Sequence, residues 1–296
     1  MSAKVILNPY SGRWKALRLK DVALAALRAA GIEFDLAVTE RPEHGIELAE
    51  QAARDGYRPI ISAGGDGATG EVINGLLRAN PSGPIGPLGV MPLGTANDLV
   101  HNLGLPLDLN EAARVIAAGK TRRIDLGKVN TWVFDNNSAV GLEPVVTIHN
   151  IRLVRLKGTI RYLVAAVKAI MEKPSWVMRL EWDDGHYEGP VSLVSVGNCP
   201  VTGGLFRMAP AADPADGMLT FVFGYAPTRR RMFALLPRTI SGDFVNDPAM
   251  HQHHARRLVI HTTTPSPLQV DGELRAEAET DFTYECLPGR LDILTP

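Results

Sequence analysis

The chain of 296 residues has the length of about two ordinary domains. Its composition, 45% hydrophobic and 21% charged, is that of a globular protein and excludes a disordered or collagen-like chain. Lysine and arginine number 31 and aspartate and glutamate 32, so a net charge of −1 argues against a nucleic-acid partner held by bulk charge. Cys199 and Cys286 form no CxxC motif and fit a reducing compartment. With no bilayer-length apolar segment and no signal-peptide profile at the start, we expect a cytoplasmic protein.

The first 128 residues alternate short apolar runs with alanine-rich stretches. Strands are expected at 4–7, 32–38, 59–63 and 86–91, and helices at 15–30, 44–54 and 71–78. Strand and helix alternating in this way are typical of a parallel sheet with helices on both faces. The sequence therefore predicts an α/β domain over residues 1–128.

After Leu126 the pattern changes to short strands separated by turn residues such as Asp183-Asp184-Gly185. Strands are expected at 128–136, 176–182, 191–196, 218–223 and 258–262, and helices at 151–172 and 228–241. The fold class is therefore an α/β domain followed by a β-rich domain. We place the second domain at 129–286, with residues 287–296 able to pack back on the first.

The most informative stretch is a glycine-rich turn, Ser62 to Gly75 (SAGGDGATGEVING), which leaves a strand and enters a helix. Backbone N–H groups and a helix N-terminus converge at such a turn and favour bound phosphate. Gly65, Gly67 and Gly70 match the GxGxxG dinucleotide fingerprint. The turn follows the third strand, however, and no acidic residue ends the next one, so a dehydrogenase is disfavoured. The alternative to phosphate binding is a glycine turn with only a structural role.

Two further turns follow strands of the same predicted sheet. Asn8-Pro9-Tyr10-Ser11-Gly12 follows the first strand, and Pro92 to Leu99 (PLGTANDL) follows the fourth. Each alone is weak evidence, because such sequences occur in ordinary loops. The carboxyl ends of parallel strands share one edge of the sheet, where ligands bind. Three such turns therefore predict a binding site at that edge.

Taken in order, these motifs resemble those of the diacylglycerol kinase catalytic-domain family, the lipid kinases that include sphingosine kinases and bacterial diacylglycerol kinases. The resemblance runs essentially end to end and rests on NPYSG, Thr39 with His44, GGDG followed by EVING, PLGTAND, LGLP, RIDLG, Gly203-Gly204, Ala209-Pro210, Asp216-Gly217 and Asp271-Gly272-Glu273. It implies a nucleotide-binding α/β domain followed by a β-sandwich. It also implies ATP-dependent phosphorylation of a diacylglycerol, a sphingoid- or ceramide-type lipid or a related lipid alcohol, as in phospholipid biosynthesis.

The resemblance further implies roles for particular residues. ATP would be bound by the three turns and Thr39, that is by Asn8, Pro9, Tyr10, Ser11, Gly12, Thr39, Gly64, Gly65, Asp66, Gly67, Ala68, Thr69, Gly70 and Thr95. Asp66, Asp98 and Asp125 would form a carboxylate cluster that organises the catalytic Mg²⁺. Phosphoryl transfer asks the protein mainly for positioning and charge neutralisation, which suits such a set. For each aspartate considered alone, the alternative is a structural role as a helix cap or as a turn residue.

Two acidic motifs in the second domain complete the implied site. A lipid hydroxyl is a poor nucleophile, so a carboxylate must accept or orient its proton, and we expect Glu273 in that role with Asp271 beside it as support. The alternative is a hairpin turn, in which Asp-Gly is common. The resemblance also implies a structural Mg²⁺ site at Asp213, Asp216 and Met218, with a plain turn as the alternative.

The chain departs from the family pattern at three positions. Ala68 and Gly70 stand where the family usually has Thr and Asn, and Ala68 lacks a hydroxyl that could bind phosphate. Glu143 stands where the family favours a small or aromatic residue, which leaves the identity of the acceptor open. Two rival interpretations therefore stay open. One is an NAD kinase-like enzyme, which shares the GGDG turn, and the other is a catalytically silent lipid-binding protein.

Other histidines and basic segments carry weaker signals. His251, His253 and His254 are expected in a solvated loop, since no partner cluster has ligand spacing. Residues 151–173 and 229–238 combine basic and apolar side chains, so peripheral contact with the inner membrane surface is expected. The basic side chains are Arg152, Arg155, Lys157, Arg161, Lys168 and Lys173 in the first segment and Arg229, Arg230, Arg231 and Arg238 in the second. The alternative is a packed helix with a solvated basic side. A homodimer is left open.

Overall fold

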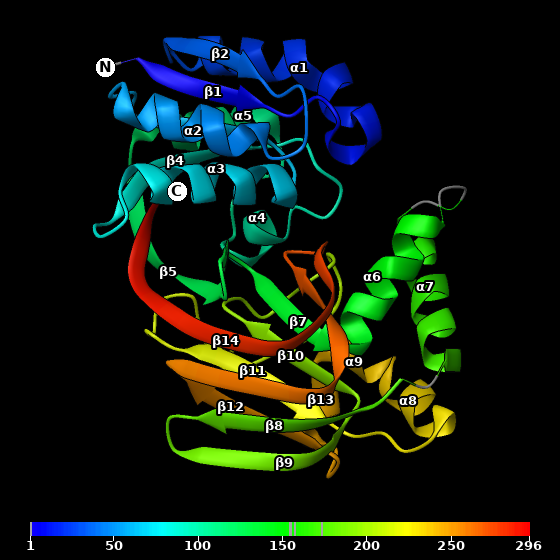
Figure 1. The fold of residues 1–296 in the computed structure, drawn as a ribbon. Helices are drawn as coiled ribbons and strands as arrows, with labels where there is room; N and C mark the ends of the chain where they lie inside the picture. The colour runs from blue at the N-terminus through cyan, green and yellow to red at the C-terminus, as the bar shows by residue number, and fades with distance from the viewer. Residues whose placement is uncertain (1, 154–155, 157, 173) are drawn as a thin grey trace. The chain divides into compact units, whose positions relative to one another are not determined.

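The structure, a computed structural model, describes residues 2–153, 156, 158–172 and 174–296. Its contacts divide the chain into two compact units (Figure 1). Unit 1 comprises Met1–Asp125 together with Pro288–Pro296, and unit 2 comprises Leu126–Leu287. In the part of the chain that the structure describes, no helix is long and apolar enough to cross a bilayer.

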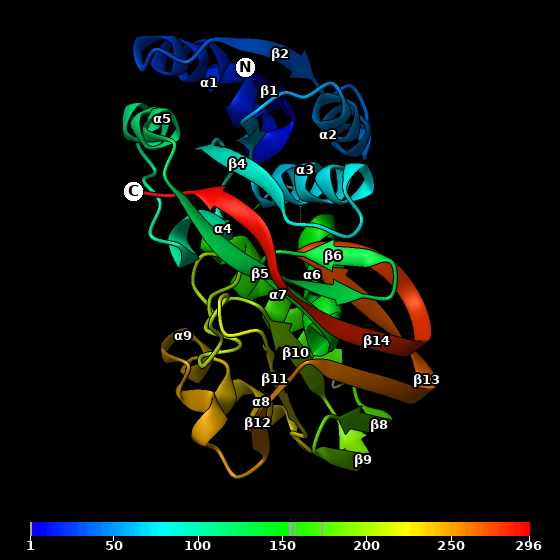
Figure 2. The same cartoon turned by 90° about the vertical axis from the view of Figure 1, so that its left-hand side faces the viewer.

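Unit 1 is a parallel sheet between helices. Its elements are β1 (Ala3–Leu7), α1 (Ser11–Ala29), β2 (Phe34–Val38), α2 (His44–Arg54), β3 (Ile60–Gly64), α3 (Asp66–Ala79), β4 (Ile85–Pro92), α4 (Asp98–Asn102) and α5 (Leu109–Ala118). The strands pair in parallel in the order β4-β3-β1-β2, and the end of β14 (Glu273–Leu294) adds to β4. Helices α1 and α5 lie together on one face and α2 and α3 on the other (Figure 2).

The sequence of unit 1 explains this layering. All five residues of β3 are buried, because helices cover both faces of the sheet and the strand can be apolar throughout. Helix α5 begins where the Asp108 side chain accepts hydrogen bonds from the backbone N–H groups of Asn110 and Glu111, both at 3.0 Å. It ends at Gly119, which has a left-handed φ of 68°.

The strand order of unit 1 contains a switch point. The chain passes from β1 to β2 on one side of β1, and then returns to place β3 on its other side. In open parallel sheets, ligands bind in the crevice at the carboxyl edge where the strand order reverses in this way. The turns that follow β1 and β3 are therefore the expected place for a site.

Unit 2 is an antiparallel β domain with helices. Its elements are β5 (Thr121–Val129, which begins in unit 1), β6 (Trp132–Phe134), β7 (Asn137–Gly141), α6 (Leu142–Arg152), α7 (Gly158–Glu172), β8 (Trp176–Trp182), β9 (Gly185–Val191), β10 (Leu193–Gly197), β11 (Leu219–Gly224), α8 (Arg229–Leu235), α9 (Arg238–Ser241), the 3₁₀ helix η1 (Asp243–Asn246), β12 (Met250–Ala255), β13 (Arg257–Val270) and β14. Strands pair in the order β12-β11-β10-β7-β13-β14. Strand β8 pairs with the first part of β13 and with β9.

Alternation along the strands builds the core of unit 2. In β8, Trp176, Met178 and Leu180 are buried while the residues between them face solvent. These side chains pack in one cluster with residues of the other strands, among them Phe221 and Phe282. A sheet with one face exposed to solvent and the other packed in the core requires apolar side chains at every second position of a strand.

Two helical segments differ from the sequence prediction. The helix expected over 151–172 is a pair, α6 and α7, which lie side by side (Figure 1). The helix expected over 228–241 is divided into α8 and α9 by Pro237, which lacks the N–H that a continuous helix needs. Arg155, Lys157 and Lys173, part of the expected basic segment, lie outside the described residues.

The histidine-rich segment also differs from its expected place in a loop. His251, His253 and His254 lie on β12 and pair with β11. The rings of His251 and His253 stack on Phe223 and Phe221, with centroids 5.0 and 5.6 Å apart, and burial lowers the pKa of His253. These flat rings pack as cross-strand neighbours of the phenylalanines, and this packing stabilises a strand that its polar sequence did not indicate.

Candidate functional site

Two of the glycine-rich turns flank the switch point of unit 1. The backbone N–H of Gly65, after β3, donates to Ser11 Oγ, after β1, at 3.3 Å. The backbone N–H of Asn8 donates to the Ala63 carbonyl at 3.0 Å. Thr39, at the end of β2, donates its N–H to the Leu7 carbonyl at 2.9 Å. The structure thus brings the predicted residues 8–12, 39 and 64–70 to one edge of the sheet.

The third turn packs against the second through close backbone contacts. The N–H of Leu93 donates to the Gly64 carbonyl at 2.8 Å. A Cβ added to Gly94 would lie 2.4 Å from the Cα of Gly65, so the two turns approach more closely than any side chain allows. Thr95 lies exposed just beyond this contact. A glycine-rich turn that leads into the N-terminus of α3 is an arrangement that suits phosphate oxygens.

The start of α1 is unusual in its backbone. Gly12, Arg13 and Trp14 hold left-handed φ angles of 61°, 56° and 69° in succession. Two of these residues carry a Cβ, so the turn holds strain of a kind that clusters at binding sites. The next residue, Lys15, donates from Nζ to the Gly94 carbonyl at 2.9 Å. Sequence reasoning missed Lys15, because a lysine in a helix is ordinarily a surface residue.

The three predicted aspartates have different surroundings. The Asp66 carboxylate accepts hydrogen bonds from the backbone N–H groups of Asp98, Leu99 and Asn97; burial raises its pKa and these bonds oppose the shift. Asp66 and the buried Asp98 are thus neighbours. Asp125 Oδ1 accepts from the backbone N–H of Gly289 at 2.6 Å, which ties β5 to the returning C-terminal segment within unit 1.

These residues fit a phosphate and a partly hydrated magnesium ion. No group of three or more His, Cys, Asp and Glu side chains among the described residues is arranged to hold a metal by itself. Mg²⁺ usually takes one or two carboxylates and completes its shell with water and substrate phosphate oxygens. Asp66 and Asp98 supply such a partial set beside the glycine-rich turns.

The EVING segment has a structural role. Glu71, on α3, accepts hydrogen bonds from the backbone N–H groups of Glu43 at 3.0 Å and Gly45 at 2.9 Å. It therefore caps the start of α2, whose own N-cap residue makes no side-chain cap. A Cβ on Gly75 would lie 2.3 Å from the Ile46 carbonyl oxygen. Glu71 and Gly75 hold α2 against α3 and so fix the turn that opens α3.

In unit 2, Asp271 and Glu273 have contrasting environments. The half-buried Asp271 carboxylate accepts from the backbone N–H groups of Asn137 at 2.9 Å, Asn136 at 3.1 Å and Asp135 at 3.3 Å. Burial raises the pKa of Asp271 to about 6. Asp271 thus holds the backbone that leads into β7, which makes it a positioning residue.

Glu273 is the accessible acid of the pair. Its side chain is 48% exposed, and Oε2 lies 2.8 Å from Nη2 of Arg275. The Arg275 guanidinium in turn lies over the Trp132 ring, 4.3 Å from its centroid. This stacked ion pair holds the Glu273 carboxylate in place while leaving it open to a ligand. Sequence reasoning had no signal for Arg275 or Trp132, because the pairing depends on strands far apart in the chain.

The predicted structural Mg²⁺ residues form a tight turn. Asp213 Oδ1 accepts from the backbone N–H of Ala215 at 3.0 Å, and Asp216 Oδ1 from that of Met218 at 2.9 Å. Each carboxylate therefore bonds within its own turn, as Asp commonly does. The metal role of Asp213, Asp216 and Met218 stays a prediction.

Unit 2 also contains an apolar cavity that the sequence did not predict. It encloses about 750 Å³ of space free of protein atoms, including its opening, and lies among α6, α7, α8 and the ends of β10 and β11. Its walls include Tyr162, Ile170, Phe206 and Met232. Among the described residues that line it, Glu143 is the single acid. Burial raises the pKa of Glu143 to about 7, and the Ser195 hydroxyl beside it opposes part of the shift.

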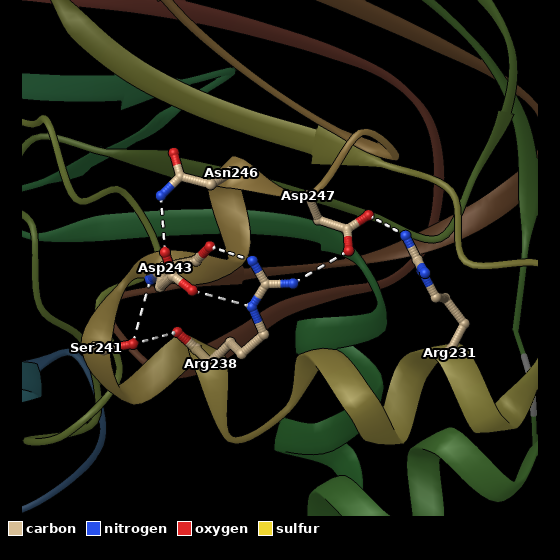
Figure 3. Close-up of polar contacts among 6 residues, drawn as sticks. All are labelled: Arg231, Arg238, Ser241, Asp243, Asn246 and Asp247. Atoms are coloured by element: carbon tan, nitrogen blue, oxygen red, sulfur yellow. Dashed lines mark hydrogen bonds and ion pairs between the residues drawn. The ribbon is translucent and has the colours of Figure 1, made fainter.

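A cluster of ion pairs fixes the helical corner beside this cavity (Figure 3). Asp247 contacts both Arg231 and Arg238, the latter at 3.1 Å, and Arg238 also reaches Asp243 at 3.2 Å. A hydrogen bond from the Ala249 backbone and these arginines lower the pKa of Asp247. Two of the arginines expected to face a membrane are therefore engaged inside unit 2.

Basic residues nearer α7 are engaged in a similar way. Arg229 donates to the Met171 carbonyl at 2.7 Å, and Arg161 donates to the Asn150 carbonyl at 2.6 Å. The exposed residues of α7 include an apolar stripe at helical spacing, Ile160, Leu163, Val167 and Met171, beside the exposed Lys168 and Glu172. The adjoining face of the same helix lines the cavity with Tyr162, Ala166 and Ile170.

Comparison with known proteins agrees with this architecture. The family model described as the diacylglycerol kinase catalytic domain matches residues 2–129. A second model, the YegS C-terminal NAD kinase beta sandwich-like domain, matches residues 137–295. A protein from Staphylococcus epidermidis named diacylglycerol kinase is 30% identical over 99% of this chain and 92% of its own length. One of the same name from Staphylococcus saprophyticus is 28% identical over 99% and 95%.

Solved structures share the fold. A crystal structure from Bacillus anthracis str. Sterne matches with a TM-score of 0.81 at 23% identity, over the whole of this chain and 97% of the other. Another from the same organism has a TM-score of 0.73 at 20% identity, with the same coverage. The chain belongs to the diacylglycerol kinase family, with the catalytic α/β domain followed by the β-sandwich domain. It is a kinase of the lipid phosphotransferase class, which confirms the family, fold class and enzyme class expected from sequence.

Proposed function

We propose that this chain transfers the γ-phosphoryl group of ATP to the hydroxyl of a lipid alcohol, with Mg²⁺, at the cytoplasmic surface of a membrane. The observation that carries the proposal is the close contact of Gly65 with Gly94, which brings the second and third glycine-rich turns together at the carboxyl edge of the sheet in unit 1. The family membership supports phosphoryl transfer, and the apolar cavity of unit 2 supports a lipid acceptor.

In unit 1 we propose binding of ATP and neutralisation of its phosphate charge. Residues 8–12 and 64–70 would hold the phosphates through backbone N–H groups, and Lys15 would add a cation at the same edge. Asp66 and Asp98 would hold Mg²⁺, which would neutralise phosphate charge when bound, and Asp125 would act by holding β5 through its bond to Gly289. Asp66 also joins the second glycine-rich turn to the third, so it acts on positioning as well as on charge.

In unit 2 the proposed work is proton transfer. The lipid hydroxyl oxygen forms a bond to the γ-phosphorus, the bond from that phosphorus to the β–γ bridging oxygen breaks, and ADP leaves. The hydroxyl proton passes to the Glu273 carboxylate, whose exposure and fixed position suit a general base. Asp271 keeps the backbone before β7 in place for this step.

The apolar stripe on α7 supports peripheral docking on a bilayer. A helix that is apolar on both its buried and its exposed faces is stable when something covers the second face. For a lipid kinase that cover is the acyl region of a membrane, with Arg152 and Lys168 near anionic head groups. The stripe, rather than the arginines at 229–231, is the proposed contact.

The test is direct. Purified protein is incubated with labelled ATP, Mg²⁺ and, in separate reactions, short-chain diacylglycerol, monoacylglycerol, a sphingoid base, a ceramide and NAD. Label transferred to a lipid supports the proposal, and label transferred only to NAD supports an NAD kinase. Binding of lipid without any transfer of label would instead indicate a catalytically silent protein.

A further inference from the structure

The cavity of unit 2 contains one feature that an acyl chain does not explain. Glu143 lies in its lining and is 8% exposed, and its Oε1 has no hydrogen-bond partner among the described residues. The Ser195 hydroxyl beside it has no partner of ordinary geometry either. A buried carboxyl with an unpaired oxygen is unfavourable, and in this cavity a bound ligand that donates a hydrogen bond would supply the missing partner.

Strand pairing relates the position of the Glu143 carboxyl to that of Glu273, the proposed general base. Ser195, beside Glu143, pairs with Ala139 on β7. Asn137 lies two residues back along β7, roughly 7 Å away at the usual rise of a strand. Its main chain accepts from the Asp271 N–H at 2.8 Å, at the turn that carries Glu273. The strand pairing therefore connects the Glu143 carboxyl, through β10 and β7, to the turn that carries Glu273.

The chemistry of the group selects among lipid heads. An ionised carboxylate accepts hydrogen bonds and donates none, so its natural partner is an O–H or N–H group. A monoacylglycerol has a second free hydroxyl close to the one to be phosphorylated, and a sphingoid base has an amine there. A diacylglycerol has only one free hydroxyl, because ester bonds occupy its other two oxygens.

We propose that Glu143 binds a second hydrogen-bond donor on the acceptor head group, so that the preferred acceptor is a lipid alcohol with a free hydroxyl or N–H near the phosphorylated hydroxyl, rather than diacylglycerol. This inference rests on the proposed function for the identity of the reacting hydroxyl. Ser195 is a positioning residue in it, because its hydroxyl lies beside the carboxyl.

The experiment compares soluble short-chain lipids, so that no membrane is involved. The lipids are 1-octanoylglycerol, 1,2-dioctanoylglycerol and a short-chain sphingoid base, which separates a hydroxyl donor from an N–H donor. Binding to the full chain is measured without ATP, by displacement of a fluorescent fatty-acyl probe, and KM and kcat are measured with ATP. Binding without ATP distinguishes failure of this inference from failure of the proposed kinase activity.

The variants separate the effect of the polar group at position 143 from the effect of side-chain shape in the cavity. Glu143→Leu should weaken binding of the lipids with a second donor about tenfold or more, and should leave 1,2-dioctanoylglycerol within about twofold. Glu143→Gln, which keeps an acceptor oxygen, should recover part of that loss. Met232→Leu, an apolar change in the same lining, should alter all the lipids alike.

Three results would overturn the inference. One is an equal change for all three lipids in Glu143→Leu, as expected if the carboxyl binds only water. Another is a loss confined to the diacylglycerol, as expected if a protonated Glu143 donates to an ester carbonyl. If Glu143→Leu does not fold, Ser195→Ala takes its place, and it should show a smaller loss for the same lipids; an unchanged preference in that variant would also reject the inference.

Discussion

The two units build their candidate sites from different parts of the polypeptide. In unit 1 the site consists mainly of backbone, since the turns meet at Gly65 and Gly94 and N–H groups are the proposed phosphate ligands. In unit 2 it consists of side chains, namely Glu273 on its arginine, Asp271 under the β7 backbone, and Glu143 in an apolar wall. Recognition by backbone groups suits ATP, a ligand common to many enzymes. Recognition by side chains suits the selection of one lipid acceptor among many.

The comparison teaches where variation is tolerated. Ala68 and Gly70 depart from the family pattern in unit 1 without removing a backbone donor, and Ala68 is buried against the turn. Glu143 departs in unit 2 and places a single carboxyl in the wall of an otherwise apolar cavity. We therefore expect the first departures to matter little for ATP and the second to decide the lipid.

The largest expected effect comes from the side-chain site. Glu273→Gln should lower kcat by about 10²–10⁴, the usual effect of losing a general base, while KM for ATP changes little. Steady-state kinetics with a soluble lipid alcohol measure both. The matched control is Glu188→Gln, an exposed acid on β9. If Glu273→Gln turns over near the normal rate, Glu273 is not the base.

The backbone site should respond to a single methyl group. The Cβ of Gly94→Ala would lie 2.4 Å from Gly65 Cα and must push the two turns apart, so kcat/KM for ATP should fall about 10²-fold. Gly83→Ala, in the exposed loop before β4, is the control, because its Cβ meets only the Asn80 side chain. Unchanged ATP kinetics in a folded Gly94→Ala variant would contradict the backbone account of unit 1.

The pH dependence of stability tests the buried acid of unit 2. The pKa of Glu143 is about 7 when folded against a usual value of 4.5, so between these values the folded chain holds more protons than the unfolded one. Its destabilising effect therefore grows as the pH rises through this window, and reaches about 3 kcal/mol above it.

Glu143→Leu should consequently gain stability relative to wild type at pH 8, and much less at pH 5. Urea unfolding of both proteins at the two pH values measures the difference. Asp271, whose pKa is also raised, is present in both proteins and cancels. A gap between the variant and the wild type that does not change with pH would mean that Glu143 is not ionised in the folded chain at pH 8.

The fold class could be predicted from sequence because local patterns carry it. The β3 strand expected at 59–63 lies at 60–64, and that expected at 86–91 extends over 85–92, since buried parallel strands are continuously apolar. The segments that were missed depend on distant partners. β12 is half histidine and is a strand because β11 offers phenylalanines beside it, and β14 pairs with β13, β5 and β4 in turn.

The candidate sites divide in the same way. The turns of unit 1 are visible in sequence, because the signal is the spacing of the glycines after a strand and needs no distant partner. Lys15, Arg275 and the cavity around Glu143 are invisible, because each exists through contacts between segments far apart in the chain. Sequence could mark Glu143 as a departure from the pattern, but only the fold shows that its surroundings are apolar.

The smallest expected effect concerns the surface of unit 2. Leu163→Gln with Val167→Gln replaces the middle of the α7 stripe, where the side chains are 37% and 42% exposed. If these side chains enter a bilayer, losing about 1 kcal/mol each should raise the apparent KM for vesicle-presented lipid about thirtyfold and leave soluble short-chain lipid unaffected. Val177→Gln, which changes an exposed residue of β8, is the matched control.

Binding to anionic vesicles should weaken with added salt, because salt screens the charges through which Arg152 and Lys168 contribute. Equal kinetic changes on vesicles and on soluble lipid would mean that the stripe supports the cavity from outside, and that the membrane contact lies elsewhere.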